Sequence, residues 1–564
     1  MGKENFLTSF WRNGKIFFVR RQTNILSAAI VLMAMIFASG VLGLVRDRLL
    51  AAFFFNRQDQ WQLDIYFASF RLPDMLFQVL ILSTLSAAFI PVFTDYLTKN
   101  EKEAYRLASS ILNIGMLVFF LASLVVFIFV KPLSQLITHE LSEGELALMI
   151  NLTRLLLFAQ FFFLLSNFLT GILQSYQRFL LPSLSAVLYN LGIILGIIFL
   201  TPIIGIYGPV IGVIIGAFLH FIVQLPVVKK LGFQYRLLFD FSNPGVRKIG
   251  ELMLPRTIAF AINQIELNMV VFLGTALSMG SLSIYNFAQH LNALPVSLFG
   301  LTIGQAALPT LAREAQKDRD NFRRLFSSSL LQIFYLSLPV GIILLVLRVP
   351  LVRLVFGTKN FPWEATLTTA KVVGIMSLFL GVRSASQLMI RAFYALQDTV
   401  TPLILSVINI TISVSLALWF IFGLHSNIVG LALAQGIGEF LFVVLLFLIL
   451  EKKIRYLLTR KFFIDFGKII LASFFTALSL WIPMRILDRF ILDTTRTINL
   501  IILTTITLLI GAGTYLLFSL ILKISQLGNF LMVLKRFGQW RKILSESDEV
   551  LDTSQVSSLP SETE

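Results

Sequence analysis

Charged side chains inside long apolar runs are the residues of this sequence that could do chemistry. Arg46 and Asp47 lie at the end of the first apolar run, Arg71 lies in the second, and His290 lies in a later one. A charged group at the centre of a bilayer costs about 2.5–3.5 kcal/mol on insertion scales, so most such groups have a function. Paired guanidinium groups offer several N–H donors in a fixed plane, which suits a diphosphate. The pattern predicts an anion-binding cavity.

Each of these residues also has a structural interpretation. Arg46 and Asp47 are neighbours and could form an ion pair that only stabilises the fold, or Arg46 could extend to the membrane surface. His290 could carry a positive charge when its ring is protonated, because imidazole titrates near pH 6.5, or it could be a neutral side chain packed between helices. Arg71 is harder to explain structurally, because a proline two residues later favours a break that turns it inward. A structural or interfacial role is the better interpretation for three further residues, Arg154, Lys371 and Arg383.

The composition places these charges in a membrane. The chain has 564 residues, of which 57% are apolar and 13% charged, and its mean hydropathy is +0.84. Soluble globular chains have about 45–50% apolar and about 25% charged residues, so a water-soluble enzyme is excluded. The absence of cysteine excludes disulfides and zinc–thiolate sites. The net charge of +16 is spread between apolar runs, so we expect no nucleic-acid partner, and we expect no metal or cofactor.

Fourteen apolar segments are long enough to cross a bilayer, which takes about 20 helical residues. The runs are continuous and do not alternate, which excludes a β-barrel. The predicted fold class is therefore an all-α polytopic membrane protein. The segments are 25–45, 65–97, 107–130, 147–172, 182–202, 205–226, 252–277, 284–311, 326–347, 366–390, 402–423, 427–450, 467–484 and 498–522.

Lysine and arginine are divided unequally between the two sets of alternate loops, about 31 in one set and 8 in the other. Cytoplasmic loops carry the excess of positive charge. The division predicts that both termini are cytoplasmic and that the number of spans is even. We expect a multi-pass protein of the bacterial cytoplasmic (inner) membrane.

The sequence repeats itself at an offset of roughly 219 residues. Residues 65–72 match 284–291, 87–91 match 305–309, and 176–182 match 396–402. Chance similarity among apolar segments is the alternative, but three matches keep the same register. About six spans separate equivalent points, so the halves should share one orientation about an axis along the membrane normal. The repeat predicts two six-helix lobes that face each other across a central cavity, followed by two C-terminal helices.

Several short motifs together resemble the MurJ (MviN) family of lipid II flippases, in the MOP exporter superfamily. The likeness runs over nearly the whole chain, and each motif is weak alone. The resemblance implies the MOP exporter fold, with a groove for a lipid tail at the two C-terminal helices. It also implies transport of a polyprenyl-diphosphate-linked peptidoglycan precursor from the inner to the outer leaflet, as cell wall biogenesis and cell shape require. The motifs are SGVLGLVRD at 39–47, FRLPD at 70–74, AFIP at 88–91, GILQSYQRF at 171–179 and FYALQDTVTP at 393–402.

The chain departs from the family where the resemblance implies more charge. Most members carry an arginine where this chain has His290, and often a further one where it has Gly40. An acidic residue followed by glycine is usual where it has Leu82 and Ser83. The resemblance therefore implies a less charged cavity. The sodium site of some members would fall on Val270, Ser413 and Ala417, so we do not expect it here.

The function predicted from these residues is a lipid II flippase that works by alternating access. Arg46 and Arg71 are expected to bind the diphosphate, with Asp47 and His290 beside them. Glu266 aligns with Asp47 in the repeat and is the candidate for coupling to protons. We expect no enzymatic activity, because the sequence has no nucleotide-binding Gly-Lys-Ser/Thr loop and no nucleophile motif. The expected partners are the lipid-linked precursor and membrane lipids, and we expect a monomer.

Three other functions fit the same architecture. The first is export of another lipid-linked oligosaccharide, such as a capsule or teichoic acid precursor. The second is cation-coupled drug extrusion of the MATE type, which would favour carboxylates in the cavity over arginines. The third is a scaffold that has lost transport together with cavity charge.

The predicted division of the chain follows the spans and the charged loops. It comprises a cytoplasmic segment (1–23), a first lobe (24–228), a cytoplasmic linker (229–249), a second lobe (250–451), two lipid-groove helices (452–525) and a partly disordered cytoplasmic tail (526–564).

Overall fold

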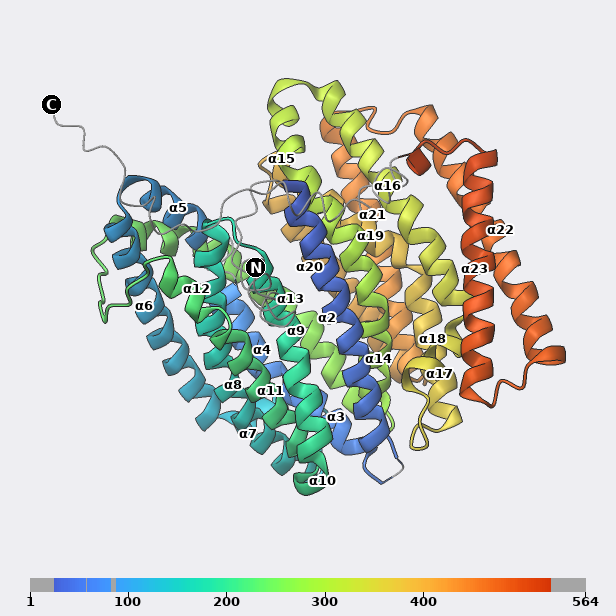
Figure 1. The fold of residues 1–564 in the computed structure, drawn as a ribbon, viewed down its shortest axis with the longest axis horizontal. Coiled ribbons are helices and arrows are strands. Elements are labelled where there is room, and N and C mark those ends of the chain that lie inside the picture. The colour runs from blue at the N-terminus through green and yellow to red at the C-terminus, as the bar shows by residue number, and fades with distance from the viewer. Residues whose placement is uncertain (1–24, 57, 83–87, 529–564) are drawn as a thin grey trace, which may run out of the picture.

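Helices make up all the regular structure that the computed structural model describes, which covers residues 25–56, 58–82 and 88–528 (Figure 1). The predicted all-α fold class is confirmed. The predicted segment 1–23 and all but the first few residues of the predicted tail lie outside the described residues.

The first lobe runs from α2 to α12, and α2 lies between the two halves of the molecule in Figure 1. Long helices alternate with short ones where proline or glycine interrupts the apolar runs. Its helices are α2 (Ile25–Phe54), α3 (Gln60–Ser69), α4 (Arg71–Phe77), η1 (Gln78–Leu82), α5 (Ile90–Lys99), α6 (Glu101–Ile128), α7 (Val130–Ile137), α8 (Glu143–Ser175), α9 (Leu180–Leu195), η3 (Gly196–Leu200), α10 (Thr201–Ile204), α11 (Tyr207–Ile222) and α12 (Leu225–Lys230).

The second lobe has the same plan, and two further helices, α22 and α23, lie at its outer edge against α16 (Figure 1). This arrangement confirms the predicted two lobes plus a C-terminal pair. The helices are α13 (Pro244–Thr275), α14 (Ser281–Pro295), η4 (Val296–Leu301), α15 (Thr302–Lys317), α16 (Arg319–Val346), α17 (Arg348–Phe356), α18 (Trp363–Leu378), α19 (Leu380–Ala395), α20 (Val400–Leu418), η5 (Trp419–Gly423), α21 (Ile428–Ile454), α22 (Arg460–Ile486), η6 (Leu487–Ile491) and α23 (Thr497–Ile521).

Ten helical stretches among the described residues are long and apolar enough to cross a bilayer. The pair α18 and α19, bent by 44°, makes an eleventh if it counts as one span. These eleven match predicted segments. The other three predicted segments, 25–45, 65–97 and 252–277, coincide with α2, with the interrupted run from α3 to α5, and with α13. The multi-pass architecture is confirmed, and the total of fourteen stays a prediction.

Backbone geometry shows the internal repeat directly. Gln177 and Gln397 follow equivalent helices, and both have positive φ values, 57° and 58°. Each turn is closed by an amide that bonds to the carbonyl five residues earlier, at 2.8 Å in the first lobe and 3.0 Å in the second, as in a Schellman motif. Asn100 and Asp318 cap α6 and α16 with φ values of −156° and −152°. Equivalent turns and caps therefore fold alike in the two lobes.

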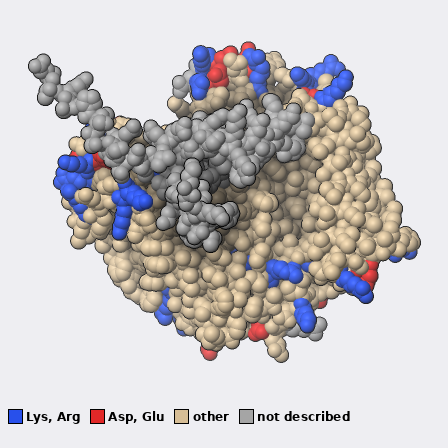
Figure 2. Space-filling view, viewed as in Figure 1, with Lys and Arg blue, Asp and Glu red and all other residues tan. Residues whose placement is uncertain are grey.

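Charged side chains lie mainly toward the upper and lower ends of the molecule in Figure 2, and most of the surface between them carries none. The upper end holds the basic loops around 99–106 and 313–324 (Figures 1 and 2). Many large apolar side chains on the long helices are exposed, including Ile128 at 60% and Leu509 at 68%. Such a surface fits contact with lipid rather than water.

Glycines allow α9 and α11 to approach closely. A Cβ at Gly192 would lie 2.4 Å from the Cα of Gly216, and one at Gly196 would lie 2.5 Å from the Cα of Gly212. Small residues permit this packing between helices in a membrane, where lipid solvates apolar side chains equally well. Because α9 also carries Asn190 and packs against α2, the close contact between α9 and α11 fixes one wall of the space between the lobes.

We expect Gly196→Ala to lower the thermal unfolding temperature of the purified protein in detergent. The added methyl group would contact the backbone of Gly212, and overpacking costs about 1–3 kcal/mol. Gly115→Ala in α6 is the matched control, because a Cβ there meets no atom within 4 Å. Equal melting temperatures for the two variants would show that the close packing of α9 against α11 does not require glycine at position 196.

Candidate functional site

A cavity of about 340 Å³ lies between α2 and α9 of the first lobe and α14 of the second. Its polar lining includes Arg46, Asp47, Asn190 and His290. Gly40 also lines it, and the side chain of Leu294 occupies the position that a Cβ at Gly40 would take. The repeat and the buried charges predicted a cavity between the lobes, and the structure places three of the predicted site residues around one.

Arg46 is anchored on two sides and still has hydrogen-bonding capacity. Its Nε and Nη2 donate to Oδ1 of Asp47 at 3.0 and 2.8 Å, and its Nη1 donates to Oδ1 of Asn190 at 3.1 Å. Asn190 is itself fixed, because its Nδ2 donates to the backbone and side-chain oxygens of Ser39. A guanidinium has five N–H donors, so two remain for a ligand.

Asp47 joins the two lobes. Its side chain is fully buried, and its Oδ2 lies 2.7 Å from Nδ1 of His290. This contact fixes a proton on Nδ1, so Nε2 accepts a hydrogen bond when the ring is neutral and donates one only when the ring is protonated. Arg46 and Asp47 cancel in charge, so the protonation of His290 decides whether the cavity carries a net positive charge.

Arg71 occupies a separate position at the start of α4. Its Nη2 donates to Oε1 of Gln264 at 2.8 Å and its Nε donates to Oδ1 of Asn268 at 3.4 Å, both on α13. Among the described residues no carboxylate lies within ion-pair distance of it. Amides hold this arginine, Asp74 on the same helix interacts with it electrostatically without forming an ion pair, and three of its five donors remain. The structure does not place Arg71 in the lining of the α2–α14 cavity.

Glu266 lies elsewhere in the second lobe. Its Oε1 accepts a hydrogen bond from Nε2 of Gln435 on α21 at 3.2 Å. It makes no contact with the cavity residues that the structure describes, so the repeat-equivalent positions 47 and 266 have different surroundings.

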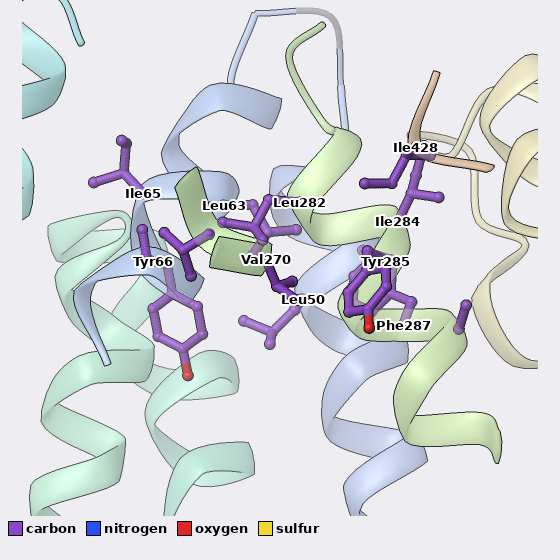
Figure 3. Packing of buried hydrophobic residues seen from close by; sticks show 14 of the residues in the cluster. Leu50, Leu63, Ile65, Tyr66, Val270, Leu282, Ile284, Tyr285, Phe287 and Ile428 are labelled. Carbon is purple, nitrogen blue, oxygen red and sulfur yellow. The ribbon is translucent and has the colours of Figure 1, made fainter. Parts of the chain in front are cut away.

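One end of the interface between the lobes is closed by apolar packing. Leu50 and Leu63 of the first lobe contribute to the same buried cluster as Val270 and Leu282 of the second, and Figure 3 shows these side chains lying close together. The cluster is continuous across the two lobes, near the end of α2 and the start of α3.

Polar contacts reinforce this closure. Asp64 on α3 accepts from the amides of Gly280 and Ser283 at 2.6 and 2.7 Å, which caps α14 from the opposite lobe. A carboxylate at a helix N-terminus satisfies free amides and complements the helix dipole. Arg48 donates to the carbonyl of Leu354 at 2.6 Å, and Asn360 donates to that of Ala52 at 2.6 Å. We call Asp64, Arg48 and Asn360 the interlobe latch.

Two repeated helical lobes, a lipid-compatible surface and a cavity between the lobes that holds a buried arginine define a polytopic membrane transporter. The profile of one family, described as lipid II flippase MurJ, matches residues 50–500. The chain belongs to this family.

Known proteins of the same family align with most of the chain. The lipid II flippase MurJ of Burkholderia cenocepacia is 27% identical over 447 residues, which cover 76% of this chain and 84% of that protein. The probable lipid II flippase MurJ of Vibrio cholerae is 29% identical, with coverage of 79% and 86%. A solved structure of a lipid II flippase MurJ in an inward closed conformation has a TM-score of 0.72 at 25% identity, covering 87% of this chain and 98% of the other.

A MATE multidrug transporter of the MOP superfamily in an inward-facing conformation has the same fold, with a TM-score of 0.61 at 15% identity. It covers 76% of this chain and 98% of the other. This likeness concerns the architecture alone.

Sequence reasoning missed the groups that hold the site residues in place. Asn190 and Asp64 each act on a partner more than 140 residues away, and no local pattern gives such a pairing. The sequence gives Arg383 no local partner and favours a structural or interfacial role, whereas the structure places it near Glu266 and Glu439. The only sequence signal for this contact is a charge within a span.

We expect Asp47→Asn to reduce the folded yield and thermal stability of the protein strongly. It leaves Arg46 buried without its counter-charge, and breaking a buried pair costs about 3–5 kcal/mol. Asp95→Asn is the control, because Asp95 forms an exposed pair with Lys99 that is worth about 0–1 kcal/mol. Adding Arg46→Gln to Asp47→Asn should recover part of the loss, and failure to recover any would argue against the pair as the cause.

Proposed function

We propose that this protein moves lipid II, a polyprenyl-diphosphate-linked peptidoglycan precursor, from the inner to the outer leaflet of the cytoplasmic membrane. Membership of the lipid II flippase family supports the substrate. The observation that carries the proposal is the cavity between the lobes, where Arg46 keeps two free N–H donors. No bond is made or broken, so the activity is transport.

Diphosphate recognition rests on Arg46 and Arg71. Phosphate oxygens accept charge-assisted hydrogen bonds, which are roughly twice as strong as neutral ones. Arg71 holds its charge against amides rather than carboxylates, so an anion does not have to displace a carboxylate to reach it. His290 adds a third donor when its ring is protonated, and Asp47 orients both Arg46 and His290.

The size of the cavity requires the lobes to move. Pockets of about 300–1,000 Å³ hold drug-sized ligands, and a disaccharide with a peptide is larger than these. The cavity of about 340 Å³ therefore takes the diphosphate and part of the headgroup only after the basic end opens. The interlobe latch closes the opposite end meanwhile. Alternating access then consists of releasing the latch while the basic end closes.

The distribution of positive charge orients this cycle. Both termini and the basic loops lie in the cytoplasm in our proposal, so the latch faces the outside. An inside-negative potential favours outward movement of anions by about 2.3 kcal/mol per charge per 100 mV, or about 4–5 kcal/mol for a doubly charged diphosphate. The polyprenyl tail stays in lipid beside α22 and α23. A monomer suffices, because one chain supplies both lobes.

We expect the double variant Arg46→Ala, Arg71→Ala to lose lipid II translocation in proteoliposomes with an imposed inside-negative potential. Loss of both guanidinium groups removes the main donors for the diphosphate. Arg154→Ala is the matched control, because Arg154 is exposed on α8 and stacks over Phe127, with its guanidinium carbon 4.7 Å from the ring centroid. It should flip lipid II at the parental rate.

Undiminished translocation by the double variant would discard the site. If the parent protein transports a fluorescent drug but does not transport lipid II, the result would favour MATE-type extrusion instead. If the protein transports a capsule or teichoic acid precursor instead of lipid II, the proposed mechanism would stand with a different headgroup as substrate.

We expect the outer end of the interface between the lobes to open more often in the Asp64→Asn variant. The amide is a weaker acceptor for the N-terminal amides of α14, so the closed state loses part of its latch. The chain has no cysteine, so Ser297→Cys in the cavity lining provides a single reporter. A membrane-impermeant maleimide added outside should label it several-fold faster with Asp64→Asn than without. Asp493→Asn in an exposed loop is the control, and equal labelling of all three proteins would contradict the latch.

A further inference from the structure

Two carboxylates and one guanidinium lie together inside the second lobe. Glu266 is on α13, Arg383 on α19 and Glu439 on α21, and each interacts electrostatically with the other two. All three side chains are partly buried, and none lines the α2–α14 cavity. We call these three residues the Glu266 cluster. The proposed mechanism of substrate binding does not use them.

The cluster lies at the depth where charge is most costly. Glu439 is eleven residues beyond Ile428, the first residue of α21, which places it about 17 Å along the helix at 1.5 Å per residue. The hydrocarbon core is about 30 Å thick, so this is close to its middle. An uncompensated charge at this depth costs about 2.5–3.5 kcal/mol or more.

Neutral groups bind the two carboxylates. Gln435 donates to Glu266 at 3.2 Å and accepts from the hydroxyl of Tyr285. Ser386 donates its hydroxyl proton to the carbonyl of Arg383 at 2.9 Å, and its side chain lies beside Glu439. Because the hydroxyl proton of Ser386 is used in this bond, its oxygen is left to accept a hydrogen bond from a protonated Glu439.

The charges of the cluster do not balance. Among the residues that the structure describes, no ion pair joins Arg383 to either carboxylate. Of the helices packed around it, α14 contributes the phenol of Tyr285 and α20 contributes only neutral polar groups to its contact with α21. The titratable side chains of α18, Glu364 and Lys371, are exposed. Two carboxylates and one guanidinium therefore leave one negative charge to be neutralised.

We propose that Glu266 and Glu439 share one exchangeable proton beside Arg383, and that this proton is the coupling ion of the transport cycle. A proton fits better than a metal ion, because the described residues contain no group of three or more side chains suited to metal ligation and Arg383 would repel a cation. Release of the proton leaves both carboxylates ionised, and Arg383 then gains a second partner. The site thus has two charge states with different preferred contacts.

The helix α13 connects this site to the substrate site. It carries Glu266 on the side toward α21, and it carries Gln264 and Asn268, which hold Arg71 of the first lobe. Glu266 is two residues from each of them. A change in the contacts of Glu266 therefore acts on the helix that positions Arg71. This coupling rests on the proposed function, whereas the proton site itself does not.

Infrared difference spectroscopy of the full-length protein in lipid counts protonated carboxyl groups, because a carboxylic acid has a C=O stretch that a carboxylate lacks. The parent should hold one such group in the cluster at neutral pH. Glu266→Gln and Glu439→Gln should each remove it, because the remaining carboxylate then balances Arg383. Arg383→Gln should add a second one, because both carboxylates then need a proton. Glu143→Gln, at the exposed start of α8, should change nothing.

Two results would overturn the proton site: an unchanged band in both glutamate variants, or no added band with Arg383→Gln. Because three separate variants report on the count, one that fails to fold leaves the test intact. The direction of change differs between the variants, which a simple loss of structure would not produce.

Coupling is tested by lipid II translocation in proteoliposomes at zero membrane potential with an imposed pH gradient. The parent rate should respond to the gradient, and Glu266→Gln and Glu439→Gln should lose that response. A parent rate that is independent of the gradient would overturn the coupling. A parent that moves no lipid II under any condition would refute the proposed function, while the infrared count still decides the proton site.

Discussion

The cost of an unbalanced charge in hydrocarbon governs the polar structure of this protein. Arg46 is neutralised by Asp47, a residue with no solvent exposure, and Arg71 is held by amides instead. The first arrangement fixes a guanidinium rigidly in the wall of the cavity. The second keeps its charge available to an anion. One lobe therefore carries both an arginine paired with a carboxylate and an arginine that forms no ion pair, and an anionic headgroup is a suitable partner for the second.

The same constraint explains why the lobes meet where they do. Asp47 contacts His290 across the seam, and Asp64 caps α14 from the opposite lobe, so buried carboxylates of the first lobe find their partners in the second. Around them, apolar residues of both lobes form one continuous cluster. A contact made of a few hydrogen bonds and packed side chains can be exchanged for another set, which a rocking motion requires.

Much of the fold followed from the sequence, because apolar run length and the 219-residue repeat are properties that a membrane imposes over long stretches. The site was only partly predictable. Arg46, Asp47 and His290 line one cavity, Arg71 lies outside it, and the contacts of Asn190 and Asp64 depend on helices that come together only in three dimensions. An offset in sequence predicts equivalent positions but not equivalent neighbours.

We propose that buried arginines contact the diphosphate of a lipid-linked substrate between the lobes. Solid-state NMR of the protein with ¹⁵N-labelled arginine and bound lipid II measures this contact directly, through dipolar coupling between guanidinium nitrogens and phosphorus. We expect a coupling that weakens with Arg46→Gln and disappears when Arg71→Gln is added. Bound lipid II with no nitrogen–phosphorus coupling, or with a coupling that survives both substitutions, would contradict it.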